Sequence, residues 1–423
     1  MTDTPVPAPA PTPTARGPTR RHRELTGSIL AAGLRSTPPT GCSNAPERGR
    51  RVISSEGARS DVMSGVRLRL LPMVVVPSSL LGIAERVERR LDDLLVAESS
   101  RWAALDDELA APFASLRSLV LSGGKRLRPA FCYWGWIGAG GDPEDRRISD
   151  AGAAFELLHA FALFHDDVMD GSATRRGERT THLSFADRHD DNLWRGEARR
   201  FGEGVAILVG DLAFVYADEL MYGAPLPAWR LWNELRIELN VGQYLDIVGT
   251  ARGERDRAAA ERIARYKSGK YTVERPLHVG TALAAPERAD LLVQLSGYGL
   301  PLGDAFQLRD DVLGAFGDAD RTGKPVGDDL REGKPTPLLA TASARATTAQ
   351  RTLLERVGRP DLSGDEVVAL QQVLVDTGAL ADLEVTIESL TNEAIDALDR
   401  ADITDDARKE LTELAHYVAW RES

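Results

Sequence analysis

Long apolar segments with helical periodicity constrain the fold of this chain more strongly than any other feature. The clearest of them lie at 151–170, 205–221, 291–313 and 381–398. They are too long for strands, and they rarely alternate between polar and apolar residues. Several are apolar around most of the helical circumference, which is typical of helices buried inside a large bundle. We therefore predict an all-α fold, a large single-domain bundle of ten or more helices with no convincing strand.

The N-terminal segment differs in composition from this helical part. The first sixty residues hold nine prolines and nine arginines but no lysine, and they show little apolar periodicity. We predict a disordered tail over 1–75 and a helical domain over 76–423. An alternative is that the true start is Met63 or Met73 and that the preceding segment has no role.

Composition argues against several classes of function. The net charge of −12 and the pI near 5.2 disfavour nonspecific nucleic-acid binding, which depends on a basic surface. Only Cys42 and Cys132 are present, without a Cys/His cluster, so the sequence indicates neither a disulfide framework nor a zinc site. A reducing cytoplasm is the expected compartment. No apolar run approaches the roughly 18 residues of a membrane span.

Two aspartate-rich stretches, at 164–177 and 306–318, are associated with the most apolar helices. In a helix, Asp166 and Asp170 share one face, and His159 lies about two turns away on that face. Carboxylates at this spacing can share a hard cation, and Mg²⁺ commonly takes only one or two of them together with phosphate oxygens. Further Asp-Asp pairs, which taken alone indicate solvated helix surface, begin at 92, 106, 190, 328 and 405.

The second stretch repeats this geometry in part. Asp310 and Gly314 are four residues apart, and Gln307 lies on the same face three residues earlier. The loop that follows supplies Lys324 and Lys334. A carboxylate that points into an apolar interior is costly without a compensating cation, so metal ligation is the economical interpretation of both stretches.

Basic residues suited to phosphate groups accompany the acidic stretches. In GGKRLRP, Lys125 and Arg128 follow a glycine pair that permits close backbone approach, so they can hold one phosphate group. The alternative is a basic helix start after a Gly-Gly turn. Arg175 and Arg176 follow the first acidic stretch, and their planar guanidinium groups suit bidentate phosphate contacts. Their alternative role is ion pairing with the nearby aspartates.

A third basic cluster, YKSGKYT at 266–272, joins Lys267 and Ser268 to a predicted helix break. Folding must bring the clusters together, because Asp166 and Asp310 are 144 positions apart. Together the acids and bases predict an enzyme that uses Mg²⁺ to remove a diphosphate from an organic substrate.

The order and spacing of these motifs resemble those of the trans-isoprenyl diphosphate (polyprenyl) synthases over about 76–423. The matching elements are GGKRLRP, DDVMD followed by RRG, the KSG element, FQLRDD, and GK with EGKPTP downstream. Geranylgeranyl diphosphate synthases are the most similar members. The resemblance implies a helical bundle around a deep central cavity, a homodimer, and about three Mg²⁺ ions per active site. It also implies condensation of isopentenyl diphosphate with dimethylallyl, geranyl or farnesyl diphosphate.

The same resemblance implies roles for individual residues. Those that match metal ligands are Asp166, Asp170, Asp310 and Asp311. Those that match positions holding isopentenyl diphosphate are Lys125, Arg128, His159 and Arg176. Those that match positions holding the allylic diphosphate are Arg175, Lys267, Lys324 and Lys334. Those expected to assist catalysis are Lys267, together with Ser268 and Gln307, whose oxygens face the developing allylic cation.

One position departs from the family pattern. The second motif usually ends in a third aspartate, where this chain has Gly314. Because the first aspartate resembles the principal ligand, we expect activity to survive with a lower metal affinity or rate.

Product length is expected to depend on residues just before the first motif. Short-chain members of the family that this chain resembles often carry an aromatic residue five positions before the first aspartate. Here that residue is Phe161, and it is followed by the small Ala162. DDVMD has no two-residue insertion, as in type I geranylgeranyl synthases, so a C20 product is predicted. Core packing is the alternative role for Phe161.

Other functions are alternatives to this one. A farnesyl or longer-chain synthase would keep the same motifs. A class I terpene cyclase needs no second diphosphate site, so the isopentenyl-site residues disfavour it. A noncatalytic subunit could lose these acids and bases without penalty, yet only Gly314 departs from the pattern.

Overall fold

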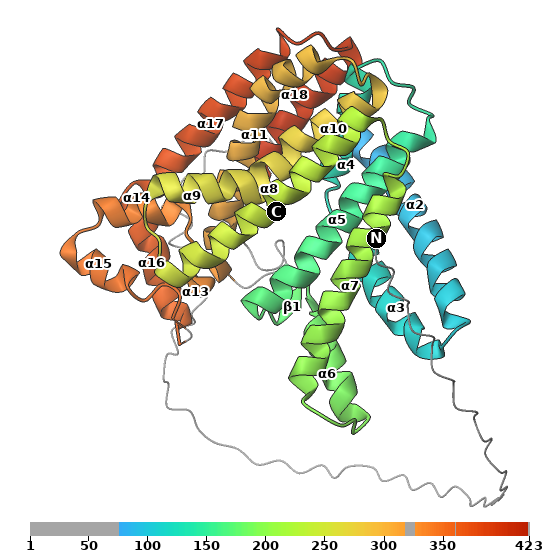
Figure 1. The fold of residues 1–423 in the computed structure, drawn as a ribbon. Helices are drawn as coiled ribbons and strands as arrows, with labels where there is room; N and C mark the ends of the chain where they lie inside the picture. Colours follow the sequence, from blue (N-terminus) through green and yellow to red (C-terminus); the bar gives the residue numbers. More distant parts are fainter. Residues whose placement is uncertain (1–75, 318–325, 360, 422–423) are drawn as a thin grey trace, which may run out of the picture. The chain divides into compact units, whose positions relative to one another are not determined.

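The computed structural model describes residues 76–317, 326–359 and 361–421, and these residues form a helical bundle (Figure 1). The predicted tail over 1–75 lies outside the described residues. The first half contains α2 (Ser78–Ala103), the short 3₁₀ turn η1 (Asp107–Leu109), α3 (Ala110–Leu121), α4 (Leu127–Gly138), α5 (Arg146–Asp170), α6 (Thr181–Asp191), α7 (Ala198–Leu220) and α8 (Leu226–Arg252).

The second half continues the same architecture. It contains α9 (Arg257–Ala264), the π-helical segment η2 (Arg265–Glu274), α10 (Arg275–Ala284), α11 (Ala289–Phe316), α13 (Asp328–Glu332), α14 (Pro337–Arg345), α15 (Thr348–Leu354), α16 (Gly364–Asp376), α17 (Ala379–Leu398) and α18 (Asp405–Trp420). The predicted all-α bundle is confirmed. No helix in the described part of the chain is long and apolar enough to cross a membrane.

A short β-ladder differs from the prediction that the chain has no strand. β1 (Thr174–Arg175) pairs antiparallel with β2 (Glu178–Arg179). Arg176 and Gly177 between them have φ values of 54° and 80°. Positive φ at both central residues characterises a two-residue turn whose twist matches that of paired strands, and glycine adopts it without steric cost. The two arginines after α5 therefore lie in a hairpin.

The two helices that carry the acidic stretches, α5 and α11, each pack against another long helix. α5 lies along α7, and α11 lies along α17 (Figure 1). The middle of α5 is buried on all sides because its residues are mainly small or apolar, including the fully buried Phe155 and Leu158. α11 joins two apolar clusters, since Phe306 packs in the larger one and Leu308 in the smaller C-terminal one. Rigid packed helices thus carry both acidic stretches.

Close helix approaches position the segment at 266–272. A Cβ atom on Gly242 of α8 would lie 2.3 Å from the backbone nitrogen of Lys267. On α11, a Cβ atom on Gly303 would lie 2.6 Å from the carbonyl oxygen of Gly269. Side chains at these glycines would push η2 away from its neighbours. Their absence brings Lys267 and the residues after it into the space between α8 and α11.

The helix break predicted at 266–272 is wrong. The chain runs from α9 through η2 into α10 without leaving the helical path, but its turns widen to π-helical geometry over Arg265–Glu274. Such widened turns are rare and are frequent at functional sites. Here the widened segment carries Lys267 and Ser268.

Candidate active site

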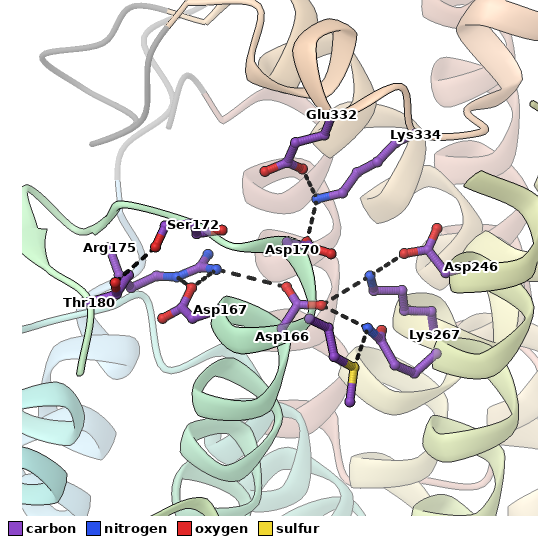
Figure 2. A network of polar contacts seen from close by, with 12 residues as sticks. Asp166, Asp167, Asp170, Ser172, Arg175, Thr180, Asp246, Lys267, Glu332 and Lys334 are labelled. Carbon is purple, nitrogen blue, oxygen red and sulfur yellow. Dashed lines mark hydrogen bonds and ion pairs between the residues drawn. The ribbon is translucent and has the colours of Figure 1, made fainter. Parts of the chain in front are cut away.

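The first acidic stretch lies at the C-terminal end of α5, where Gly171 with φ 64° ends the helix. Asp166 is surrounded by donors: Gln243 donates from Nε2 to its Oδ1 at 2.9 Å, and Nζ of Lys267 lies 3.4 Å from the same oxygen (Figure 2). Burial raises the pKa of Asp166, but the charges of Lys267 and Lys334 outweigh it and hold the pKa below its ordinary value. Asp166 is therefore ionised at neutral pH.

Asp170, one helical turn further along, has a different environment. Its Oδ2 lies 3.5 Å from Nζ of Lys334, which also contacts Glu332 at 2.5 Å (Figure 2). Burial, together with the charges of Asp166 and Glu332, raises the pKa of Asp170 to about 6. Neighbouring carboxylates that repel one another gain from a divalent cation between them.

Arg175 is held by Asp167, a residue that the sequence did not single out. Nε of Arg175 donates to Oδ1 of Asp167 at 2.9 Å, whereas the nearest oxygen of Asp166 lies 3.8 Å away (Figure 2). The ion pairing considered for this arginine therefore exists, but its main partner is the aspartate between the two predicted ligands. Asp167 thereby fixes the guanidinium group of Arg175 beside the end of α5.

Arg176 contacts the GGKRLRP loop instead. Its Nη1 donates to the carbonyl oxygen of Leu119 at 3.1 Å, to Oγ of Ser122 at 3.0 Å, and to the carbonyl oxygen of Gly123. These bonds tie the hairpin to the loop that carries Lys125. The two adjacent arginines thus connect different parts of the site.

The loop itself is anchored by Arg126, whose side chain is buried. Its guanidinium group donates to Glu88 on α2 at 2.8 Å and to Glu156 on α5. A buried guanidinium group needs such partners, because an unpaired charge in the interior is costly. While Arg126 is engaged with these acids, its neighbours Lys125 and Arg128 line a cavity.

Arg128 and His159 lie near the ring of Tyr271. The guanidinium carbon of Arg128 is 4.3 Å from the ring centroid, and the His159 centroid is 6.3 Å from it. Burial and the charge of Arg128 lower the pKa of His159 well below its ordinary value, so the imidazole is neutral. Nε of Arg128 and Nδ1 of His159 have no hydrogen-bond partner among the described residues. Such buried polar atoms suit a ligand that brings oxygen atoms.

Lys267 joins α5 to α8. Besides approaching Asp166, its Nζ donates to Oδ2 of Asp246 at 2.5 Å. Burial lowers the pKa of Lys267, but the two carboxylates outweigh it and raise the pKa above its ordinary value. The ammonium group is therefore charged, and Asp246 is a second residue that the sequence did not single out.

On α11, the two aspartates of the second stretch differ in environment. Asp310 accepts a hydrogen bond from Arg421, and Asp311 accepts one from Nε2 of Gln307 at 2.9 Å. Asp311 is almost fully buried, and burial raises its pKa well above the ordinary value despite the bond from Gln307; the charges of Asp329 and Asp310 add to this effect. Gln307 thus directs its amide group toward Asp311.

Two cavities, of about 840 Å³ and about 420 Å³, bring most of these residues together. Both are lined by Arg128, His159, Arg176, Lys267, Ser268, Phe306 and Asp310. Predicted residues that line only the larger cavity are Lys125, Gln307, Asp311 and Lys334. Predicted residues that line only the smaller cavity are Phe161, Ala162, Asp166 and Arg175. Asp170 lines neither cavity but contacts Lys334.

The acids and bases fit a metal ion that is shared with an anionic ligand. In the described ranges, no three acidic, histidine or cysteine side chains gather closely enough to hold a metal ion unaided. Instead, Asp166, Asp170 and Asp310 each pair with a basic side chain. Mg²⁺ suits such a donor set, because it takes few carboxylates and draws its other ligands from phosphate oxygens and water. Lys324 lies outside the described residues.

Comparison with known proteins decides the family. The polyprenyl synthetase family model matches residues 112–374. The chain belongs to the polyprenyl synthetase family. A geranylfarnesyl diphosphate synthase of Aeropyrum pernix is 33% identical over 305 residues, which cover 70% of this chain and 89% of the relative. A (2E,6E)-farnesyl diphosphate synthase of Mycobacterium tuberculosis is 31% identical over 310 residues, with coverages of 71% and 80%.

A solved structure is similar over most of this polyprenyl synthetase. The crystal structure of a geranylgeranyl pyrophosphate synthase from Corynebacterium glutamicum, complexed with isoprenyl diphosphate and magnesium, matches with a TM-score of 0.76 and 36% sequence identity. The match covers 80% of this chain and 98% of that one. The family predicted from the motifs is confirmed, and with it the class of enzyme, a trans-prenyltransferase of isoprenoid biosynthesis.

The synthetase also contains site residues that sequence reasoning missed. They are Asp167, Gln243, Asp246, Arg421, Asp328 and Asp329. The last two form an Asp-Asp pair whose interpretation as solvated helix surface is wrong, because both are partly buried and line the larger cavity. The sequence signal that could have identified this pair is its position: it begins four residues after Lys324, downstream of the second acidic stretch.

Phe161 both packs in the protein interior and lines the smaller cavity. Its ring centroid lies 4.8 Å from that of Phe214 on α7 and 4.6 Å from that of His165. Ala162 lines the same cavity. The two roles considered for Phe161 are therefore compatible with each other.

Proposed function

We propose that this polyprenyl synthetase condenses isopentenyl diphosphate with an allylic diphosphate to give geranylgeranyl diphosphate, and that it acts in the cytoplasm as a homodimer. The observation that carries the proposal is the set of residues that line both cavities, which brings the basic side chains Arg128, Arg176 and Lys267 together with Ser268 and Asp310. A condensation of two diphosphates requires two basic binding places that open toward one reaction centre.

In this proposal each group of basic residues holds one substrate. Isopentenyl diphosphate is held by Lys125, Arg128, His159 and Arg176. The allylic diphosphate is held by Arg175, Lys267, Lys324 and Lys334. About three Mg²⁺ ions are held by Asp166, Asp170, Asp310 and Asp311. When bound, Mg²⁺ neutralises charge on the departing diphosphate and thereby lowers the barrier to C–O cleavage.

The proposed reaction begins when the C–O bond of the allylic substrate breaks and its electron pair leaves with the diphosphate. Lys267 and Arg175 stabilise the negative charge that develops there. Gln307 donates its amide N–H to Asp311, which leaves its carbonyl oxygen to face the allylic cation together with Ser268. The alkene of isopentenyl diphosphate then forms the new C–C bond, and the released diphosphate accepts the proton that is lost. Exclusion of water protects the cation from hydrolysis.

Phe161 and Ala162 support the C20 product. In the proposal, the prenyl chain grows into the smaller cavity, and Phe161 closes it at a depth that suits twenty carbons. If the product is farnesyl or geranylfarnesyl diphosphate, the end of the cavity lies at a different depth. Measuring the length of the product distinguishes these possibilities from a C20 product.

The exposed apolar side chains of α7 and α8 support the homodimer. On α7, Leu208 and Val215 are 62% and 60% exposed and lie seven positions apart on one face. On α8, the exposed stripe consists of Ile237, Val241 and Tyr244. Large exposed apolar surfaces of this kind mark interaction sites.

Light scattering tests the homodimer. We expect the measured mass of the wild-type protein to be twice the mass of one chain, and the mass of Val241→Glu to equal that of one chain. A monomeric wild-type protein contradicts the proposal.

Product analysis tests the proposed reaction. Purified protein is incubated with Mg²⁺, labelled isopentenyl diphosphate and, in turn, dimethylallyl, geranyl or farnesyl diphosphate, and the dephosphorylated products are sized. We expect a dominant C20 alcohol that is absent without Mg²⁺ and with Asp166→Asn. C15 or longer products would keep the reaction class and overturn the C20 assignment. No condensation with any primer would favour a noncatalytic subunit, and a cyclic hydrocarbon would favour a terpene cyclase.

A further inference from the structure

The ring of His165, the residue just before the first acidic motif, is held against the backbone of α7. Its Nε2 donates to the carbonyl oxygen of Ile207 at 3.1 Å. A Cβ atom on Gly210 would lie 2.5 Å from both Cδ2 and Nε2 of this ring, which is far shorter than van der Waals contact. The ring is therefore fixed by one hydrogen bond and by a close fit, and only glycine at position 210 leaves room for it.

His165 also borders the space into which the prenyl chain is proposed to grow. It lines the smaller cavity together with Phe161. Residues four positions apart lie on one face of a helix, and here the two ring centroids are 4.6 Å apart at an interplanar angle of 60°. This edge-to-face arrangement is a favourable one for two rings. His165 thus lies between α7 and the cavity and supports the ring of Phe161.

The ring of Phe161 has a second support, Phe214 on α7, at a centroid distance of 4.8 Å. Phe214 is covered in turn by Arg236 on α8, whose guanidinium carbon lies 5.0 Å from the ring centroid. Because Arg236 also donates to Asp218, this cation–π contact is held in place. Two helices therefore secure the Phe214 side of the wall, whereas the other side depends on how His165 is seated on α7.

We propose that His165 is a positioning residue for product length, and that Gly210 on α7 sets how far the His165 ring reaches into the smaller cavity. The inference rests on the proposed function, because it concerns the wall at Phe161. It deepens that function by adding a position on a second helix to the residues that precede the first acidic motif. His165 keeps the Phe161 ring across the path of the prenyl chain, and Gly210 lets His165 stay back from that path.

Two substitutions should change the product in opposite directions. Gly210→Ala places a methyl group where the His165 ring now lies, so the ring must move away from α7 and toward the cavity, and the path shortens. His165→Ala removes the ring and the support of Phe161, so the path lengthens. The next nearest atom to the Cβ position at 210 is Cβ of Phe164, at an ordinary contact distance of 3.5 Å. The methyl group at 210 therefore acts through His165.

Product sizing with the full-length enzyme tests the inference. Each variant is incubated with Mg²⁺, labelled isopentenyl diphosphate and geranyl diphosphate, because one, two or three additions to this primer give C15, C20 or C25. We expect Gly210→Ala to raise the ratio of C15 to C20 by about tenfold, and His165→Ala to raise the ratio of C25 to C20 by about tenfold. The double variant should release the same products as His165→Ala alone, since the methyl group then meets no ring.

A matched control lies on the same helix. A Cβ atom on Gly204 would meet no atom within 4 Å, so Gly204→Ala should leave the product ratios unchanged. If Gly204→Ala shifts them as Gly210→Ala does, a general change in α7 is responsible and the inference is overturned. Thermal denaturation of all variants shows which of them are folded. If Gly210→Ala is too unstable to assay, His165→Ala and the double variant still decide, because the two must release the same longer product.

Failure of the inference differs from failure of the proposed function. If His165→Ala releases only the wild-type product, or if the double variant keeps the shorter product of Gly210→Ala, His165 does not set product length, although the enzyme still condenses its substrates. A wild-type product of C15 or C25 corrects the C20 assignment, and the opposite shifts are then measured from that length and support the inference. A wild-type protein that performs no condensation overturns the proposed function and the inference with it.

Discussion

The Nζ atom of Lys267 lies 3.4 Å from Oδ1 of Asp166, although 101 positions separate the two residues in the sequence. Asp246 accepts a hydrogen bond from the same ammonium group. The two carboxylates keep Lys267 charged in spite of its burial. The positive charge of Lys267 is thus fixed beside Asp166. In the proposed reaction, negative charge develops there on the leaving diphosphate.

We expect Lys267→Met to lower kcat by about 10²- to 10³-fold, the effect of removing one group that stabilises transition-state charge. The KM for isopentenyl diphosphate should change little, because that substrate is held by other residues. Steady-state kinetics with each substrate varied in turn measures both constants. Lys409→Met is the matched control, since that side chain is 73% exposed on α18. A kcat within about threefold of the wild-type value would exclude this role for Lys267.

The pH dependence of isopentenyl diphosphate binding should depend on Lys125. Burial and the charge of Arg421 lower the pKa of Lys125 to about 8. The group is therefore charged below pH 8 and neutral above it, and only the charged form attracts a diphosphate. We expect the KM for isopentenyl diphosphate to rise as the pH increases through 8, by up to about tenfold per pH unit.

An arginine at position 125 provides the control for this pH dependence. Lys125→Arg keeps its charge up to far higher pH, because a guanidinium group has a pKa above about 12. The absolute KM of the variant depends on how the longer side chain fits, so the informative quantity is the slope of KM with pH between about 7 and 9.5. A flat profile for the variant beside a rising one for the wild type supports the assignment, and equal slopes contradict it.

The parts of the molecule that were predictable from the sequence have a local or periodic signal. The long apolar segments predicted α5 and α11, and the spacing of Asp166 and Asp170 predicted their shared face because helix geometry alone decides it. The glycine and basic motifs have a fixed order along the chain. That order was sufficient to indicate the family before the packing of the helices was known.

The parts that were missed depend on tertiary contacts that have no such signal. Asp246 lies in the segment GQYLD on α8, where a lone aspartate is indistinguishable from a solvated residue until packing brings it to Lys267. Arg421 is separated from Asp310 by 111 positions. The π-helical widening of η2 coincides with the close approach of Gly269 to α11. Sequence periodicity cannot predict which helices will supply the partners of a buried charge.

Arg126 is expected to support the isopentenyl site without touching substrate. Its guanidinium group is bound by Glu88 and Glu156, and removing one partner of a buried ion pair typically costs about 3–5 kcal/mol of folding free energy. We therefore expect Arg126→Met to lower the melting temperature and to raise the KM for isopentenyl diphosphate more than that for the allylic substrate. Thermal denaturation and steady-state kinetics measure the two effects. Equal increases in both KM values would indicate general destabilisation instead of a local effect on the GGKRLRP loop.

Phe161 offers the sharpest test of the product assignment. Its ring lines the smaller cavity and packs against Phe214, so Phe161→Ala removes bulk from the wall while leaving the proposed diphosphate ligands unchanged. We expect the main product to lengthen from C20 to C25 or beyond, because the prenyl chain can extend into the vacated space. The melting temperature should fall as well, since ring packing is lost.

A second phenylalanine separates the effect on product length from the effect on stability. Phe185 on α6 lines neither cavity, and it packs against the guanidinium group of Arg188. Phe185→Ala should therefore reduce stability without changing the product. If Phe161→Ala still releases only C20, the wall at Phe161 does not limit the chain, and the limit lies with residues contributed by another helix. If both variants lengthen the product, loosened packing and not the volume at position 161 controls the release of the growing chain.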